Sequence, residues 1–215
     1  MYKKKPFFII FEGVEGCGKS YQSQKLKKNL EKKGVYSLLT REPGGTRSAE
    51  SIRRLILKDY FNKGNNEKFD KYTDTLLYLA ARNEHIINKI KPALKKKRVV
   101  ICDRFVDSTL AYQVYGKKVN RYFIDNIHKF ILQGIKPNIT FILKVSSKAS
   151  KLRLKKRRTK NRYDNFHQSF YTKAQKSFLK IAKHKKNYFV LESSSNDSNL
   201  EKQIFKIVCK YLKIK

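Results

Sequence analysis

The stretch that decides the fold is Phe7-Phe8-Ile9-Ile10-Phe11-Glu12-Gly13-Val14-Glu15-Gly16-Cys17-Gly18-Lys19-Ser20. Its five leading apolar residues are typical of a strand buried on both faces of a parallel sheet. Residues 13–20 match G-x-x-x-x-G-K-[ST], and helical spacing follows to about residue 33. Glycines let successive N–H groups face an anion, while Lys19 can reach phosphate oxygens and the Ser20 hydroxyl can ligate Mg²⁺. We therefore expect a phosphate-binding loop (P-loop) that binds a nucleoside triphosphate with Mg²⁺ through Gly13, Val14, Glu15, Gly16, Cys17, Gly18, Lys19 and Ser20.

Apolar runs farther along the chain predict four more strands, at residues 35–40, 99–102, 139–145 and 188–191. Segments with helical spacing lie between them, at residues 49–58, 73–96, 107–115, 120–133, 147–157, 165–184 and 199–212. Pro92 is expected to kink or divide the longest of these helices. This alternation indicates an α/β fold, a five-stranded parallel sheet with helices on both faces. No linker divides the chain, so we expect a single domain over residues 1–215.

The charge of the chain is extreme, because 51 Lys and Arg against 17 Asp and Glu give a net charge of +34. Only 12 of the 51 are Arg, the residue on which nucleic-acid surfaces rely for bidentate contacts. A nucleic-acid-binding protein that keeps a P-loop is an open alternative, but aromatic-basic repeats, zinc-ligand spacing and a helix-turn-helix signature are missing from the sequence. We expect nucleic-acid binding that is weak and non-specific at most.

Two features indicate the compartment. Cys17, Cys102 and Cys209 lie far apart and form no C-x-x-C, which favours a reduced, cytoplasmic protein. No stretch approaches the roughly 18 apolar residues that a membrane span needs, and the N-terminus has no signal-peptide core.

Charged residues mark the remaining parts of a kinase site. Asp103 directly follows the strand predicted at residues 99–102, at the place where P-loop enzymes hold Mg²⁺ with a carboxylate. Small P-loop kinases also need a second anion site for the phosphate acceptor and a cationic lid over the transferred group. The scarce arginines fit both needs, because they lie near loops and strand ends: Arg53, Arg82, Arg104, Arg153, Arg157, Arg158 and Arg162.

Several strings, in this order, resemble the thymidylate kinase (dTMP kinase) family of the bacterial type over nearly the whole chain. Residues 11–20 resemble its P-loop, and Thr40-Arg41-Glu42-Pro43-Gly44-Gly45-Thr46 resembles its TREPGGT string. Ala80-Ala81-Arg82 is similar to its AAR helix, Asp103-Arg104 to its DR motif, and Ser108-Thr109-Leu110-Ala111-Tyr112-Gln113 to ST-x-AYQ. Asn161-Arg162-Tyr163-Asp164 resembles a drifted lid motif. The resemblance implies a P-loop nucleoside-monophosphate-kinase fold and transfer of the ATP γ-phosphate to dTMP, giving dTDP for dTTP synthesis.

The resemblance also implies a role for each matching residue. Lys19, Arg104, Arg157 and Arg158 would be catalytic, and Ser20 and Asp103 would hold Mg²⁺. The dTMP site would consist of Glu15, Glu42, Arg53, Tyr78, Arg82, Arg104, Ser108, Tyr112, Gln113 and Tyr163. Within it, Arg53 and Arg104 would hold the phosphate, Tyr78 would stack on thymine, Arg82 and Gln113 would bind the base, and Tyr112 would disfavour ribose. A homodimer is also implied.

The glycine at position 16 resembles the residue that the bacterial subclass has at this place in the P-loop. In that subclass the lid, here residues 151–164, supplies the catalytic arginine. Arg157 and Arg158 are both candidates for that role. A kinase with another nucleoside monophosphate as acceptor is the alternative enzyme. Cys17, at a helix N-terminus beside Lys19, is expected to be alkylated readily. His85, His128, His167 and His184 show no metal-ligand spacing and are interpreted as core or surface residues.

Overall fold

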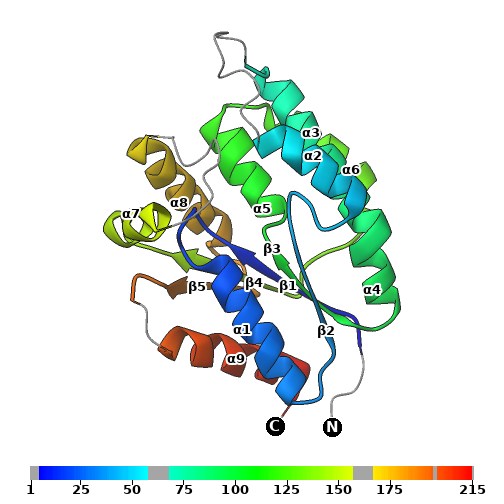
Figure 1. The fold of residues 1–215 in the computed structure, drawn as a ribbon. Coiled ribbons are helices and arrows are strands. Elements are labelled where there is room, and N and C mark those ends of the chain that lie inside the picture. The colour runs from blue at the N-terminus through cyan, green and yellow to red at the C-terminus, as the bar shows by residue number, and fades with distance from the viewer. Residues whose placement is uncertain (1–4, 58–67, 157–166, 196–197, 215) are drawn as a thin grey trace.

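The structure, a computed structural model, describes residues 5–57, 68–156, 167–195 and 198–214. Within these ranges a parallel sheet has the strand order β2-β3-β1-β4-β5 (Figure 1). Its strands are β1 (Phe7–Glu12), β2 (Ser37–Arg41), β3 (Val99–Asp103), β4 (Ile139–Lys144) and β5 (Tyr188–Glu192). All five predicted strands are confirmed, and so is the fold class.

The helical elements are α1 (Lys19–Lys32), α2 (Arg47–Leu57), α3 (Lys71–His85), η1 (Ile86–Ile90), α4 (Lys91–Lys95), α5 (Val106–Thr109), η2 (Leu110–Gly116), α6 (Arg121–Leu132), α7 (Ser147–Lys155), α8 (Gln168–Ala182) and α9 (Asn199–Leu212). In the part of the chain that is described, no helix is long and apolar enough to cross a membrane.

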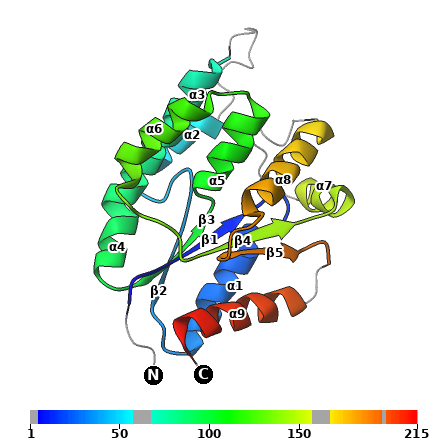
Figure 2. The same cartoon turned by 180° about the vertical axis from the view of Figure 1, so that it is seen from behind.

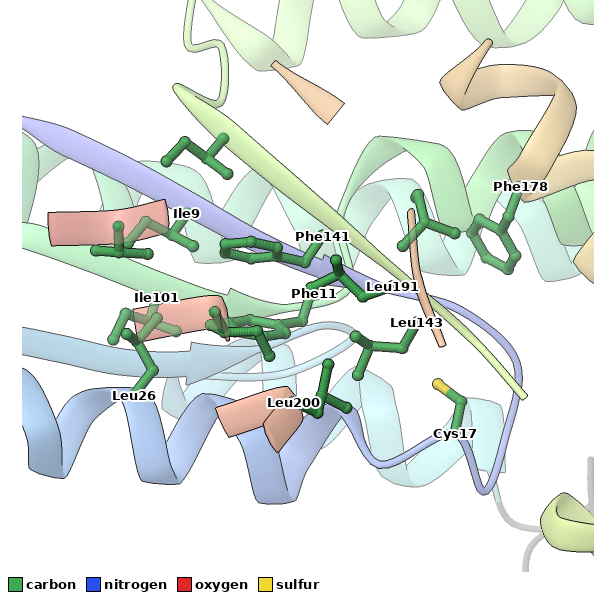
Figure 3. Close-up of a cluster of buried hydrophobic side chains, with 14 of the residues drawn as sticks. Ile9, Phe11, Cys17, Leu26, Ile101, Phe141, Leu143, Phe178, Leu191 and Leu200 are labelled. Atoms are coloured by element: carbon green, nitrogen blue, oxygen red, sulfur yellow. The ribbon is translucent and has the colours of Figure 1, made fainter. Parts of the chain in front are cut away.

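The central strand β1 buries alternate residues against opposite layers. Phe7, Ile9 and Phe11 belong to one core cluster with side chains of α1 and α9 (Figure 3). Phe8 and Ile10 belong to a second cluster with side chains of η1 and α4. The unbroken apolar run is therefore explained by helices on both faces, as Figures 1 and 2 show.

The long helix predicted at residues 73–96 is interrupted rather than uniform. It runs as α3, η1 and α4, and in η1 the turn is widened to the π-helical form. Pro92 explains the interruption, because it lacks an N–H and its ring would collide with the carbonyl four residues earlier. A wider turn at residues 86–90, in which Lys91 N–H donates to the Ile86 carbonyl, removes that conflict. The segment predicted as a helix at residues 107–115 similarly divides into α5 and the π-helical η2.

Candidate active site

The P-loop lies between the carboxyl end of β1 and the start of α1, as predicted. Gly18 is the N-cap of α1 with φ 91°, and Gly13 and Gly16 have φ 137° and 72°, a region that side chains disfavour. Lys19 is buried, and its Nζ donates to the carbonyl oxygens of Gly13 at 3.0 Å and Val14 at 2.9 Å. The lysine is thus folded back onto the loop that leads to it.

A cavity of about 600 Å³ opens beside the P-loop, at the carboxyl ends of β1, β2 and β3. The place is the one expected for ligands in an open α/β sheet. Fourteen of the predicted site residues line it: Glu15, Gly16, Gly18, Lys19, Ser20, Glu42, Arg53, Tyr78, Arg82, Asp103, Arg104, Ser108, Tyr112 and Gln113. Gly13, Val14 and Cys17 lie behind the lining. Arg157, Arg158 and Tyr163, and lid residues 157–164 in general, fall outside the described residues.

The Cys17 thiol is buried, which is at odds with the reactivity expected from the sequence. Its side chain is 0% exposed and belongs to the core cluster drawn in Figure 3. A Cβ added to Gly13 would lie only 2.8 Å from the Cys17 Sγ. The thiol therefore fills space beneath the loop, and the expectation of ready alkylation is wrong for the folded protein.

Ser20 and Asp103, the two residues expected to hold Mg²⁺, lie next to each other. The Ser20 hydroxyl donates to Asp103 Oδ2 at 2.5 Å, across 83 residues of sequence. Among the described residues, no group of three or more His, Cys, Asp and Glu side chains could hold a metal ion. A hydroxyl beside one carboxylate is an all-oxygen donor set of the kind that Mg²⁺ uses together with water and substrate phosphates.

Arg104 joins the P-loop to the segment after β3. Its Nη2 donates to Glu15 Oε1 at 2.8 Å, and Glu15 Oε2 accepts from the Tyr112 hydroxyl at 2.7 Å. Burial opposes ionisation of Glu15, but the charges of Arg104 and Lys19 outweigh it and hold the carboxyl pKa below its ordinary value. Burial likewise opposes the charged form of Arg104, yet the surrounding oxygens raise its pKa well above the usual range. Both groups are therefore charged in the working pH range.

Glu12, the last residue of β1, holds the same segment from beneath. The oxygens of its fully buried carboxyl group accept from the backbone N–H groups of Phe105 at 2.7 Å and Ser108 at 3.1 Å, and from the Ser108 hydroxyl at 2.6 Å. The Ser108 oxygen accepts in turn from Arg104 Nη1 at 3.1 Å. Sequence reasoning missed Glu12, because a polar residue at the end of a strand gives no sign of what it will cap.

Arg82 lies at the centre of a buried polar cluster. Its Nε donates to Glu42 Oε2 at 2.7 Å, and its Nη2 donates to the Phe105 carbonyl at 2.8 Å. Its Nη1 donates to Thr109 Oγ1 at 2.8 Å and meets His128 Nε2 at 2.9 Å. Thr109 and His128 are further residues that the sequence did not single out for this site.

Glu42 is shared by Arg82 and His85. The His85 Nδ1 is 3.2 Å from Glu42 Oε1, and its Nε2 is 2.7 Å from Thr40 Oγ1. Burial raises the pKa of Glu42, but the Arg82 charge and the His85 hydrogen bond outweigh it, so that the pKa lies below its ordinary value. The carboxylate is 6% exposed and acts mainly as a partner for Arg82.

Gln113, Arg53 and Tyr78, the remaining predicted side chains at the cavity, differ in burial and in hydrogen bonding. Gln113 is 2% exposed, and its Nε2 is buried without a hydrogen-bond partner in the described structure. A buried amide of this kind indicates a missing acceptor. Arg53 Nη1 donates to the Pro43 carbonyl at 2.7 Å, and Tyr78 is half-buried in the wall of the cavity.

Helix α7 touches the P-loop directly. The Ser150 hydroxyl donates to the Glu15 carbonyl at 2.8 Å, and Arg153 Nη1 donates to the Gly16 carbonyl at 3.1 Å. A Cβ added to Gly16 would lie 2.8 Å from the Ser150 carbonyl oxygen. Gly16 is therefore required by the close approach of α7, and the site has no room for a side chain at this position of the loop.

The strand order and the P-loop are those of the P-loop nucleoside-monophosphate kinase fold. The cavity, which is lined by the Asp103-Arg104 pair and by the polar cluster around Arg82, lies where such a kinase binds its nucleotides. The model of the family described as thymidylate kinase matches residues 11–204. The chain belongs to the thymidylate kinase family.

Individual relatives agree with this assignment. A thymidylate kinase of Prochlorococcus marinus (strain AS9601) is 41% identical over 202 residues, which cover 92% of each chain. One of Mycoplasma capricolum is 36% identical over 96% of each chain. The crystal structure of thymidylate kinase from Ehrlichia chaffeensis superposes with a TM-score of 0.73 at 32% identity, covering 95% of this chain and 99% of the other.

Proposed function

We propose that the protein transfers the γ-phosphoryl group of ATP to dTMP and forms dTDP, a precursor of dTTP. The observation that carries this proposal is the cavity of about 600 Å³. The same space is lined by Lys19 of the P-loop, by Arg104 after β3 and by Arg82 of the buried polar cluster. Gln113, whose amide Nε2 has no partner in the described structure, lines it as well. A donor triphosphate at the P-loop would thus lie beside an acceptor nucleotide.

The triphosphate is held by the P-loop backbone and the N-terminus of α1. Lys19 Nζ, which donates to two loop carbonyls, would turn to the β- and γ-phosphates and bring its charge with it.

Ser20 and Asp103 would hold Mg²⁺ through the two oxygens that lie 2.5 Å apart. When bound, Mg²⁺ supplies charge neutralisation at the β- and γ-phosphates. The hydroxyl and the single carboxylate leave the rest of its coordination to phosphates and water, which is usual for this ion.

Arg104 and Arg53 would bind the dTMP phosphate, since both are arginines in the cavity wall and a guanidinium can grip phosphate in a fork. Glu15 and Tyr112, hydrogen-bonded to each other at 2.7 Å, would contact the sugar at its 3′-hydroxyl and its 2′ side. Ser108 supports the phosphate site through Arg104. The ion pair between Glu15 and Arg104 links the two halves of the acceptor site.

Thymine would be bound by Tyr78, Arg82 and Gln113. Tyr78 offers an aromatic face for stacking, and the unpartnered Gln113 amide would find an acceptor on the base. Glu42 holds Arg82 in place, and Tyr163 is proposed at the acceptor site from the family resemblance alone.

Transfer is in-line and needs no covalent enzyme intermediate, because positioning and charge stabilisation account for such reactions. The catalytic cation that closes over the transferred group is proposed to be Arg157 or Arg158, which follow α7 in sequence within the lid. Gly16 cannot supply it, given the contact with Ser150.

Three further properties belong to the proposal: the oligomeric state, the location in the cell and the binding of nucleic acids. A homodimer would bury exposed apolar side chains of α3 and α6, among them Leu76, Tyr122 and Phe130. A cytoplasmic location, and weak, salt-sensitive binding of nucleic acids by the lysine-rich surface, stay predictions.

The test is an ADP-release assay over a panel of acceptors: dTMP, dUMP, dCMP, dAMP, dGMP and the ribonucleotide form of dTMP. We expect dTMP to have the highest kcat/KM, and the ribonucleotide to be poor. Absence of turnover with dTMP, or a higher kcat/KM with dCMP or a purine nucleotide, would contradict the proposal.

A further inference from the structure

The hydrogen-bond donors of Arg82 are almost fully used by the protein. A guanidinium carries five N–H donors and no acceptor. Four are assigned: one to Glu42, one to Thr109, one to His128 and one to the Phe105 carbonyl. Within the described chain, the single donor left is the second hydrogen of Nη2. Since Arg82 lines the cavity, this hydrogen is what it can offer to a base.

The geometry of the guanidinium is fixed from three elements. Glu42 follows β2, Thr109 ends α5, and His128 lies on α6. The guanidinium carbon also stands 5.4 Å from the centre of the Phe105 ring. Such a fork can rotate little, because each rotation would leave a buried donor without a partner.

His128 acts on Arg82 as an acceptor. Arginine can only donate, so the His128 Nε2 at 2.9 Å must be unprotonated. The ring is 5% exposed, and burial together with the charges of Arg82 and Arg121 lowers the His128 pKa to about 3. His128 is thus a neutral ring, held as an acceptor, 46 residues from Arg82 in sequence.

We propose that His128 is a positioning residue that sets the base preference of the acceptor site, by holding Arg82 so that one N–H points into the cavity. The proposal rests on the proposed function, in which Arg82 faces the base of a nucleoside monophosphate. The substrate class that it selects is a pyrimidine with a carbonyl oxygen at ring position 4.

The selection follows from the polarity of the groups at that position. Thymine and uracil present an oxygen that can accept from Arg82. Cytosine presents an amino group, which would set a donor against a donor and leave the buried N–H unpaired. A site whose arginine donates a hydrogen bond to the base rejects an analogue that has no acceptor at that position. The buried N–H would then have lost its hydrogen bond to water without gaining one to the ligand. The 5-methyl group plays no part in this contact.

The test compares His128→Leu with His128→Gln in steady-state kinetics on dTMP, dUMP and dCMP. Leu removes the acceptor, whereas the Gln carbonyl can restore it near the position of Nε2. For His128→Leu we expect KM for dTMP to rise about tenfold, in line with loss of a hydrogen bond that orients a charged group. We expect the dTMP:dCMP ratio of kcat/KM to fall by a similar factor, with the dTMP:dUMP ratio and KM for ATP unchanged. His128→Gln should recover most of the dTMP:dCMP ratio.

His184→Asn is the matched control, because His184 is exposed with φ 66°, a conformation that Asn tolerates. Equal loss of activity on dTMP and dCMP in His128→Leu, or no recovery in His128→Gln, would overturn the proposal and indicate a structural role. Absence of dTMP turnover by the wild-type protein would instead refute the proposed function.

A second measurement does not depend on the stability of the variants. In the wild-type protein, the nitrogen NMR signals of the His128 ring should show an unprotonated Nε2 at every pH between about 5 and 8. A protonated Nε2, or titration in this range, would also overturn the proposal.

Discussion

Gly16→Ala, paired with Gly34→Ala, isolates the contact between the P-loop and α7. The two glycines have nearly the same backbone conformation, with φ 72° and 70°. A Cβ on Gly34 would meet nothing within 4 Å, whereas on Gly16 it would lie 2.8 Å from the Ser150 carbonyl oxygen and 3.1 Å from Ser150 Oγ. The left-handed conformation costs alanine about 1 kcal/mol in both variants. The difference between them therefore measures the clash.

The extra cost at Gly16 can be worked from the bonds that α7 must give up. Moving Ser150 away breaks its hydrogen bond to the Glu15 carbonyl, about 1 kcal/mol, and stretches the one from Arg153 to the Gly16 carbonyl, about 1.5–3 kcal/mol. We expect Gly16→Ala to lose about 2.5–4 kcal/mol more unfolding free energy than Gly34→Ala if the contact opens fully. Because α7 leads into the lid, its displacement should also lower kcat by about 100-fold.

Urea unfolding and the ADP-release assay measure both effects. Gly34→Ala should keep the wild-type kcat and lose about 1 kcal/mol of unfolding free energy. Ser150→Ala, which leaves the P-loop sequence intact, should show a smaller loss of kcat in the same direction. The reasoning is refuted if Gly16→Ala unfolds like Gly34→Ala and retains wild-type kcat. It is also refuted if Gly16→Ala loses activity while Ser150→Ala keeps all of it, because the loop itself would then be responsible.

Three shorter predictions follow from single features. Burial, reinforced by the charge of Asp107, raises the Glu12 pKa to about 8, above its value in the unfolded chain, so the free energy of unfolding should fall as the pH rises from about 4.5 to 8. Glu12→Gln should flatten that slope in urea titrations; an unchanged slope would assign it to another group. The buried Cys17 should react with iodoacetamide far more slowly than the partly exposed Cys209, as read by peptide mass spectrometry, and equal labelling would contradict its burial. Phe130→Asp, at a side chain that is 79% exposed, should shift light-scattering mass toward the monomer; a monomeric wild type would remove the proposed dimer.

Local patterns were sufficient for the framework of this fold. The apolar run of β1, the glycines of the P-loop and the alternation of strands and helices each depend on residues close in sequence. They located all five strands to within two residues at either end. The widened turn at residues 86–90 could not be predicted from sequence. Pro92 indicates that the helix is disrupted but does not indicate which turn changes its geometry.

The site was predictable only where a motif marks it. Lys19 begins the helix after the P-loop, and Asp103 and Arg104 stand at the end of a strand, so their chemistry follows from position. The partners of these residues do not: Glu12 reaches Ser108 across 96 residues, and Arg82 reaches His128 across 46. In sequence, a buried histidine on an amphipathic helix is indistinguishable from one that fills space. Cys17 was misjudged for the same reason, because its neighbours in the core come from β1, β4 and α9.

The central claim is that the γ-phosphoryl group passes from ATP to dTMP in this cavity. A single-turnover experiment with ATP labelled in the γ-phosphate, Mg²⁺ and dTMP tests it directly, with nucleotides separated by chromatography. We predict that the label appears in dTDP in a one-to-one ratio with ADP. Label released as inorganic phosphate, or label retained in ATP with no labelled dTDP, would contradict the claim.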